Sequence, residues 1–173
     1  FSHELLAEAR AALRAAQPGG VDARFAHTDL ADPDWADIAA AYPVDVVLAF
    51  AVFHHIPGAD QRLRILRQVR QLLPQGGVFI HSEWQFQHSP KLMARRRPWS
   101  EAGLDESQLE AGDTLLDWRF ALPGQPEQNG LRYVHLFERA ELAELAAAAG
   151  FTVVDEFESD GEGGRLGLYQ AWR

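Results

Sequence analysis

The sequence predicts an α/β protein with a Rossmann-like, mostly parallel sheet that ends in an antiparallel hairpin. Three observations favour this fold class. Segments of strand and helix character alternate along the chain, residues 44–50 form a run that is apolar apart from Asp45, and two short strands follow one another at the C-terminus. A continuous apolar run of strand length is typical of a strand buried on both faces of a parallel sheet. With 173 residues, the chain is long enough for one domain, which we expect over residues 1–173.

The first part of the chain predicts two helices with a strand between them. Ser2 can cap a helix that ends before Pro18, because apolar residues recur at helical spacing in this stretch. A short strand is expected over residues 23–27, and a short helix over residues 34–41. Strand, helix and strand in this order predict helices packed on the faces of a parallel sheet.

The middle of the chain continues the alternation. Residues 44–50 predict the central strand, and residues 59–73 predict a helix with an apolar stripe. Pro74 and the two glycines that follow at 76–77 end this helix, and residues 78–83 predict the strand beside the central one. Because ligands of open α/β sheets bind beyond the carboxyl ends of the strands, residues 50–55 are expected to line a pocket.

The C-terminal part predicts a helix and a hairpin. Residues 137–149 have helical spacing and stop at Gly150, and residues 151–157 and 166–172 predict two strands joined by a glycine-rich turn. We expect these two strands to pair antiparallel at the edge of the sheet.

Composition narrows the function classes. The formal net charge of −9 argues against a surface that binds nucleic acid in general, although a local basic patch is compatible with it. The sequence has no cysteine, which excludes disulfides and thiolate metal sites and fits a reducing cytoplasm. It shows no signal-peptide pattern and no apolar run of membrane-spanning length. We expect a cytoplasmic protein that needs neither a membrane nor a metal.

Several segments carry a resemblance to a known family. The segments are FSHELLAEAR from residue 1, HTDLADPDW from residue 27, YPVDVVLAFAVFHHIPG from residue 42, and VRQLLPQGGVFIHSEW from residue 69. In their order and spacing they resemble the class I S-adenosylmethionine-dependent methyltransferases, in particular the methyltransferase type 11 group. The resemblance implies a methyltransferase with S-adenosylmethionine as cofactor.

Two features of that family have no counterpart in the sequence. The glycine-rich loop after the family's first strand is absent, and the acidic residue that holds the ribose hydroxyls would stand just before Phe1. The resemblance therefore implies an N-terminally truncated fragment that lacks two strands and one helix. We expect such a fragment to be inactive alone.

The resemblance also assigns cofactor-binding residues. Asp29 and the backbone N–H of Leu30 match the pair that reads the adenine amine and N1, and Phe1 is similar to the apolar residue beside the adenine ring. Phe50 and Ala51 match positions whose backbone lines the methionine part. Without the resemblance, Asp29 would be interpreted as a cap of the turn that follows it.

The adjacent histidines at the end of the apolar run are ambiguous. His54 and His55 cannot share a face of a helix or strand, so they are poor metal ligands as a pair. A structural role is favoured for His54, and His55 is a candidate for contact with cofactor or acceptor. Methyl transfer depends mainly on positioning, and a base is needed only if the acceptor must lose a proton.

An insertion at about residues 84–130 is expected to form a lid over the acceptor. It contains aromatic residues and a basic cluster at residues 95–97, which could hold an anion and stack on a base. The alternative is a solvated helix end with its tryptophans packed inward.

The segment LRYVHLFERAEL from residue 131 resembles part of the tRNA wobble-uridine carboxymethyl methyltransferases. Arg132 and His135 match that pattern, whereas Val134 departs from it. The resemblance implies that Arg132 grips an acceptor carboxylate, and Arg132, His135 and His55 are therefore the candidate catalytic residues. A strand-edge pair leading into a helix is the structural alternative for Arg132 and His135.

Three functions follow. Methyl transfer to a small molecule, a carboxylate among the acceptors considered, is preferred because the net charge opposes RNA. A tRNA-modifying methyltransferase is the first alternative, and a non-catalytic binding or scaffold domain is the second.

Overall fold

The structure is a computed structural model that describes residues 3–16, 22–120, 126–161 and 163–173. The chain divides into two compact units, residues 1–43 and residues 44–173. Phe1, expected beside the adenine ring, lies outside the described residues. Within the described residues, no helix is both long enough and apolar enough to cross a membrane.

The first unit contains the two predicted helices, α1 (His3–Ala16) and α2 (Asp37–Ala40). The strand predicted over residues 23–27 is wrong, because this segment is irregular. A strand is stable only when its N–H and C=O groups pair with a neighbour, and none of the described strands pairs with this segment.

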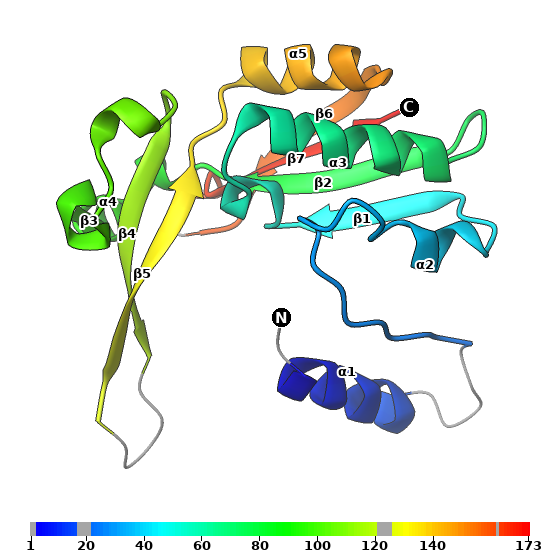
Figure 1. The fold of residues 1–173 in the computed structure, drawn as a ribbon, viewed down its shortest axis with the longest axis horizontal. Coiled ribbons are helices and arrows are strands. Elements are labelled where there is room, and N and C mark those ends of the chain that lie inside the picture. Colours follow the sequence, from blue (N-terminus) through cyan, green and yellow to red (C-terminus); the bar gives the residue numbers. More distant parts are fainter. Residues whose placement is uncertain (1–2, 17–21, 121–125, 162) are drawn as a thin grey trace. The chain divides into compact units, whose positions relative to one another are not determined.

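The second unit contains a four-stranded sheet of order β1-β2-β7-β6 (Figure 1). Its strands are β1 (Val46–Phe50), β2 (Val78–Trp84), β6 (Val153–Ser159) and β7 (Gly167–Trp172). β1 and β2 are parallel, and β7 is antiparallel to both β2 and β6. β6 therefore runs in the direction of β1 and β2, and only β7 is reversed. This confirms the α/β fold with a mostly parallel sheet and an antiparallel C-terminal hairpin.

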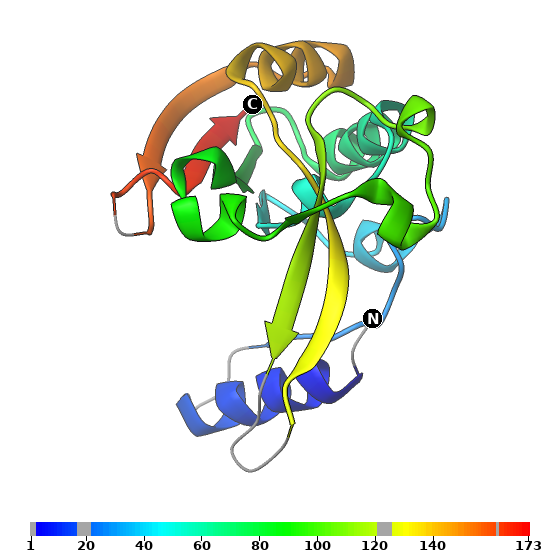
Figure 2. The same cartoon turned by 90° about the vertical axis from the view of Figure 1, so that its left-hand side faces the viewer.

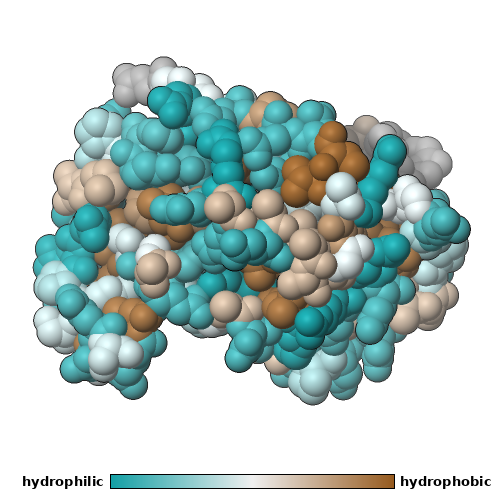
Figure 3. Space-filling view, turned by 90° about the horizontal axis from the view of Figure 1, so that it is seen from above, coloured by the Kyte–Doolittle hydropathy of each residue, from teal (hydrophilic) through white to brown (hydrophobic). Residues whose placement is uncertain are grey.

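Two helices, α3 (Ala59–Leu72) and α5 (Arg139–Ala149), cover one face of this sheet (Figure 1). The core between helices and sheet is aromatic and aliphatic. The Phe79 and Trp172 rings meet edge to face at 5.6 Å, and Leu66 of α3 is buried above them. Seen from the side of α5, hydrophilic side chains cover much of the surface, with hydrophobic ones between them (Figure 3).

The expected burial and position of β1 are wrong. β1 is an edge strand of the described sheet, and Val46, Leu48 and Phe50 are 50%, 59% and 50% exposed. Alternate side chains of a strand point to opposite faces, so these three side chains share one face of the sheet, and the alternating burial along β1 shows that this face is the more exposed one. Their apolar character alone could not show that these side chains are half-exposed or more.

A second sheet lies between β2 and α5 in the sequence. It comprises β3 (Arg96–Arg97), β4 (Asp113–Phe120) and β5 (Gln128–His135), with the short helix α4 (Pro90–Met93) before it. β4 and β5 form a long twisted ribbon (Figure 2). Phe86, Leu116 and Val134 form a small core beneath this sheet.

Candidate functional site

The carboxyl ends of β1 and β2 form the centre of the candidate site. Ala51, directly after β1, has a positive φ of 54°, which is uncommon for a residue other than glycine. Its backbone N–H donates to the Ser82 carbonyl oxygen at 3.0 Å, which holds the turn against β2. The Phe50 ring lies 6.0 Å from that of Tyr169. The structure thus places Phe50 and Ala51 at the strand end where open α/β sheets bind ligands.

A buried carboxylate lies directly behind this turn. Glu83 of β2 is fully buried and accepts hydrogen bonds from the His54 backbone N–H at 2.9 Å and the His54 Nδ1 at 2.8 Å. Its other oxygen accepts from His81 Nδ1 at 3.0 Å. Burial by itself raises the pKa of Glu83, but the hydrogen bonds from His54 and His81 outweigh it, and the pKa lies below its usual value. His54 therefore has the structural role favoured from the sequence.

His55 points the other way, toward the second sheet. Its Nδ1 lies 3.0 Å from the Tyr133 carbonyl oxygen, which can only accept, so Nδ1 carries the proton. Burial is the main cause that lowers the pKa of His55. A neutral His55 then presents the lone pair of Nε2 as a hydrogen-bond acceptor.

Arg132 of β5 reaches the same place. Its guanidinium carbon lies 5.5 Å from the centre of the Trp84 ring, and the ring of His55 meets the same indole edge to face at 5.8 Å. Burial, together with the charge of Arg95, lowers the pKa of Arg132. Among the described residues, the structure gives Arg132 no hydrogen bond and no carboxylate partner. Arg132 and His55 are thus brought together around Trp84, and the guanidinium is available to an anionic ligand.

His135 lies on the opposite face of β5, because it stands three positions after Arg132 on the strand. It is 1% exposed, its Nδ1 lies 2.7 Å from Asp113, and its Nε2 lies 3.0 Å from Glu141. Tyr133 also donates to Asp113, at 2.6 Å. The structure therefore does not bring His135 to Trp84, and its catalytic role stays a prediction that this geometry does not favour.

The same network contains a possible set of metal ligands. Oxygen and nitrogen atoms of Glu110, Asp113 and His135 lie within 4.8 Å of one another. The Arg62 guanidinium donates to Glu110 at 2.5 Å and lies 3.5 Å from Glu141. The charges of these groups offset one another, and the guanidinium opposes a cation, so the cluster is better described as an ion-pair network in which Arg62, Asp113 and His135 are buried and Glu110 and Glu141 are partly exposed.

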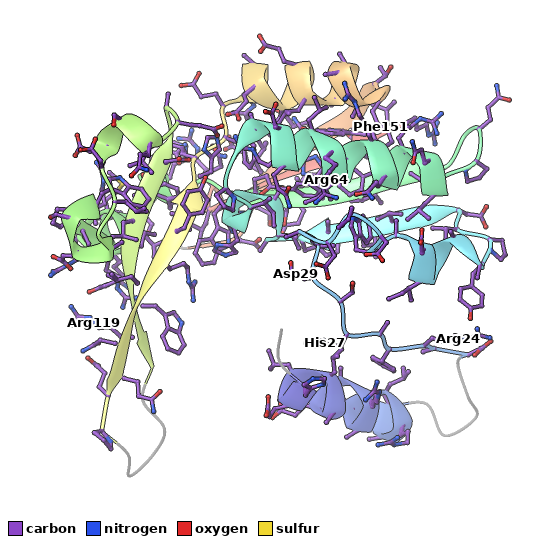
Figure 4. All side chains as sticks on the ribbon, in the orientation of Figure 1. Arg24, His27, Asp29, Arg64, Arg119 and Phe151 are labelled. Carbon is purple, nitrogen blue, oxygen red and sulfur yellow. The ribbon has the colours of Figure 1, made fainter. Side chains whose placement is uncertain are left out.

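The expected adenine-binding residues lie in the first unit. Asp29 is exposed on the irregular segment before α2 (Figure 4), and its Oδ1 accepts the Ala31 N–H at 2.8 Å. This is the turn-capping role that the sequence left open. Leu30 is half-buried in the same turn. The assignment of both residues to the adenine stays a prediction.

The basic cluster of the insertion is partly neutralised. Arg97 forms a bidentate pair with Glu101 at 2.9 and 2.7 Å, and Arg95 lies 3.8 Å from Asp117. This agrees in part with the solvated alternative.

Sequence reasoning missed two residues of the site, Glu83 and Trp84. One signal could have found the first: Glu83 follows His81 by two residues on a predicted strand, so both side chains must share a face.

The described sheet of order β1-β2-β7-β6 is of the Rossmann-like α/β type, a type whose ligands bind beyond the carboxyl ends of the parallel strands. A family model described as a methyltransferase domain matches residues 3–156. The chain belongs to this methyltransferase domain family, which confirms the resemblance found in the sequence.

Two individual relatives with names that describe them as methyltransferases agree with this family assignment. A protein of Encephalitozoon cuniculi named as a methyltransferase is 30% identical over 111 residues, which cover 64% of this chain and 46% of that protein. The tRNA (carboxymethyluridine(34)-5-O)-methyltransferase of Schizosaccharomyces pombe is 27% identical over 122 residues, covering 64% of this chain and 50% of that enzyme. The chain thus matches about half the length of these relatives.

A solved structure shares the fold. The structure of an S-adenosylmethionine-dependent methyltransferase from Clostridium acetobutylicum aligns with a TM-score of 0.69, covering 99% of this chain and 72% of that one. The two sequences are 14% identical, so this similarity establishes the fold.

Proposed function

We propose that the chain is part of an S-adenosylmethionine-dependent methyltransferase that methylates the carboxylate of a small molecule. The observation that carries the proposal is the Arg132 guanidinium, which stacks on Trp84 beside His55 without a carboxylate partner among the described residues. An arginine fork matches a carboxylate with two parallel hydrogen bonds.

The cofactor would supply an activated methyl group on a sulfonium. Phe50 and Ala51 lie at the strand end where its methionine part is expected, and Ala51 turns the backbone away from the sheet with its positive φ. Asp29 and Leu30 are the proposed adenine contacts, with Phe1 beside the ring. The Oδ1 of Asp29 already caps a turn, so the adenine amine would use Oδ2.

The proposed reaction depends mainly on the orientation of the acceptor carboxylate relative to the methyl group. A carboxylate is ionised at neutral pH and carries its own nucleophilic lone pairs, so no side chain has to remove a proton. Arg132 would hold one carboxylate group in line with the methyl. His55, with its proton fixed on Nδ1 by Tyr133, offers only an acceptor nitrogen and suits a hydroxyl of the acceptor.

His135 is proposed as a positioning residue. Through Asp113 and Glu141 it fastens β5 to β4 and α5. Because β5 also carries Arg132, this attachment would set the height of the guanidinium over Trp84.

A tRNA acceptor is the second candidate. The relative from Schizosaccharomyces pombe acts on tRNA according to its name, and residues 95–97 are basic. The pairing of Arg97 with Glu101, and the net charge of −9, favour the small acceptor over it.

The deciding experiment measures methyl incorporation by the full-length protein into a panel of small acids and into bulk tRNA. For a small acid, Arg132→Lys should lower kcat/KM about 10- to 150-fold, since a charged hydrogen-bonded contact is worth about 1.5 to 3 kcal/mol. Arg119→Lys is the matched control, because Arg119 is exposed and pairs with Asp117. Equal activity of the Arg132 variant and wild type would refute the proposed carboxylate site.

A tRNA acceptor would give a different pattern. Replacing Arg95, Arg96 and Arg97 by alanine together would then weaken tRNA binding and flatten its salt dependence. Strong, salt-sensitive labelling of tRNA would overturn the small-acceptor proposal. Cofactor binding without labelling of any acceptor would favour the scaffold alternative.

A further inference from the structure

We propose that Glu83 is the positioning residue of the acceptor site, and that it acts through His54 and Trp84 on Arg132. This inference rests on the proposed function for its kinetic test, but its structural test does not need activity. Glu83 itself is fully buried and cannot touch an acceptor.

The first step is the hold of Glu83 on His54. One carboxylate oxygen accepts both the backbone N–H and the ring Nδ1 of His54, at 2.9 and 2.8 Å. Two contacts to one residue fix both the 3₁₀ turn Phe53–His55 and the rotation of the ring. The turn begins two residues after Ala51, so Glu83 fixes the path of the chain just beyond β1.

The protons in this cluster can be assigned. A lowered pKa keeps Glu83 ionised, so it accepts hydrogen bonds and His54 and His81 donate from Nδ1. The Nε2 atoms of both histidines are buried and have no hydrogen-bond partner among the described residues. An N–H at those positions would be left unsatisfied, so each ring keeps its proton on the nitrogen that faces Glu83.

The second step runs through aromatic contacts. The His54 ring stacks on Trp84, with centroids 5.1 Å apart and planes at 25°. The Trp84 backbone N–H also points at His54 Nδ1 from 3.3 Å, but Nδ1 donates to the nearer, charged Glu83 oxygen at 2.8 Å, so the longer Trp84 contact is secondary. On the same indole, the Arg132 guanidinium carbon lies 5.5 Å from the ring centre. The position of the cation therefore depends on the indole, and that of the indole depends on the imidazole that Glu83 orients.

A glutamine at position 83 tests this sequence of contacts. The glutamine amide has the size of the Glu83 carboxylate but only one acceptor oxygen. Its NH₂ group is a donor, and it would face the Nδ1–H of His54 or His81, which is also a donor. His54 or His81 must then either rotate or move its proton to Nε2, where no described residue accepts it. We expect Glu83→Gln to raise the KM for the acceptor acid at least tenfold and to change kcat much less. Glu144→Gln, an exposed change on α5, is the matched control and should leave KM unchanged.

The structural readout is the ¹⁵N–¹H signal of the Arg132 Nε, which reports the ring current of Trp84. Glu83→Gln should shift this signal, and Trp84→Leu should shift it further. In the Trp84→Leu background, adding Glu83→Gln should change neither the signal nor KM again, since the contact that transmits the effect is gone.

Other outcomes would overturn the inference. If Glu83→Gln lowers the melting temperature but leaves both KM and the Arg132 signal unchanged, Glu83 is only a core residue. If Glu83→Gln does not fold, Glu83→Asp, which keeps the charge but shortens the reach, replaces it under the same criteria. A shifted Arg132 signal without methylation of any acid would refute the proposed function and leave the role of Glu83 standing.

Discussion

Replacing Asp113 by asparagine should destabilise the chain by about 3 to 5 kcal/mol, the usual cost of removing one partner from a buried ion pair. Asp113 and His135 have side chains 5% and 1% exposed, so solvent screens their interaction little. Asp113 also accepts from the Tyr133 hydroxyl at 2.6 Å and from the Glu110 N–H at 2.9 Å. Asparagine keeps one acceptor oxygen and turns an NH₂ group toward the other donors, so part of this hydrogen bonding is lost.

Urea unfolding at pH 5.5 measures the loss, and Asp45→Asn is the control because Asp45 is exposed. The pH dependence gives a second criterion. Burial by itself lowers the pKa of His135, but hydrogen bonds to Glu141 and Asp113 outweigh burial and raise the pKa above its ordinary value of 6.5. The protonated imidazole therefore stabilises the fold fully below pH 6.5, and this stabilisation is lost as the pH rises through the raised pKa. Burial by itself raises the pKa of Asp113, but hydrogen bonds from Tyr133 and His135 outweigh burial and lower the pKa below its ordinary value of 3.8. The ionised carboxylate therefore stabilises the fold fully above pH 3.8, and this stabilisation is lost as the pH falls through the lowered pKa.

The difference between wild type and the Asp113 variant should therefore be largest between pH 3.8 and 6.5 and should shrink at pH 9. An equal difference at pH 5.5 and pH 9 would refute the ion-pair reasoning. A difference below about 1 kcal/mol would refute it as well, because a loss of that size is typical of a surface substitution.

Two further pairs of variants test the fold. Leu66→Ala should lower the free energy of unfolding by urea by about 2 to 5 kcal/mol, because the Leu66 side chain is only 2% exposed. Leu48→Ala should change it by no more than about 0.5 kcal/mol, because Leu48 is 59% exposed. Similar losses for the two variants would mean that Leu48 is covered in solution. Gly112→Ala should cost about 1 to 3 kcal/mol, since its φ is +96° and a Cβ would lie 2.7 Å from the Leu136 carbonyl oxygen. Gly163→Ala meets no atom within 4 Å and should change the melting temperature little; a neutral Gly112 variant would contradict the strain expected at that turn.

The sequence by itself determined the order of elements in the second unit. Apolar periodicity and glycine or proline stops located α3, β2, α5 and the β6–β7 hairpin within a few residues, because these signals are local. These local signals did not single out Arg132, which only the resemblance of residues 131–142 to a known family suggested, whereas His55 drew attention by its place at the end of the apolar run. The strand expected over residues 23–27 failed for the opposite reason. Strand formation depends on a partner, which no local signal supplies.

Only the tertiary structure decided which side chains meet. His55 and Arg132 are 77 positions apart and come together because β5 crosses the end of β2, where Trp84 lies between them. Arg132 and His135 are three residues apart and separate, because a strand turns alternate side chains to opposite faces. Whether the carboxylate of Glu83 is charged or neutral depends on burial and on the two histidines that donate to it, and burial is a property of the packed molecule alone.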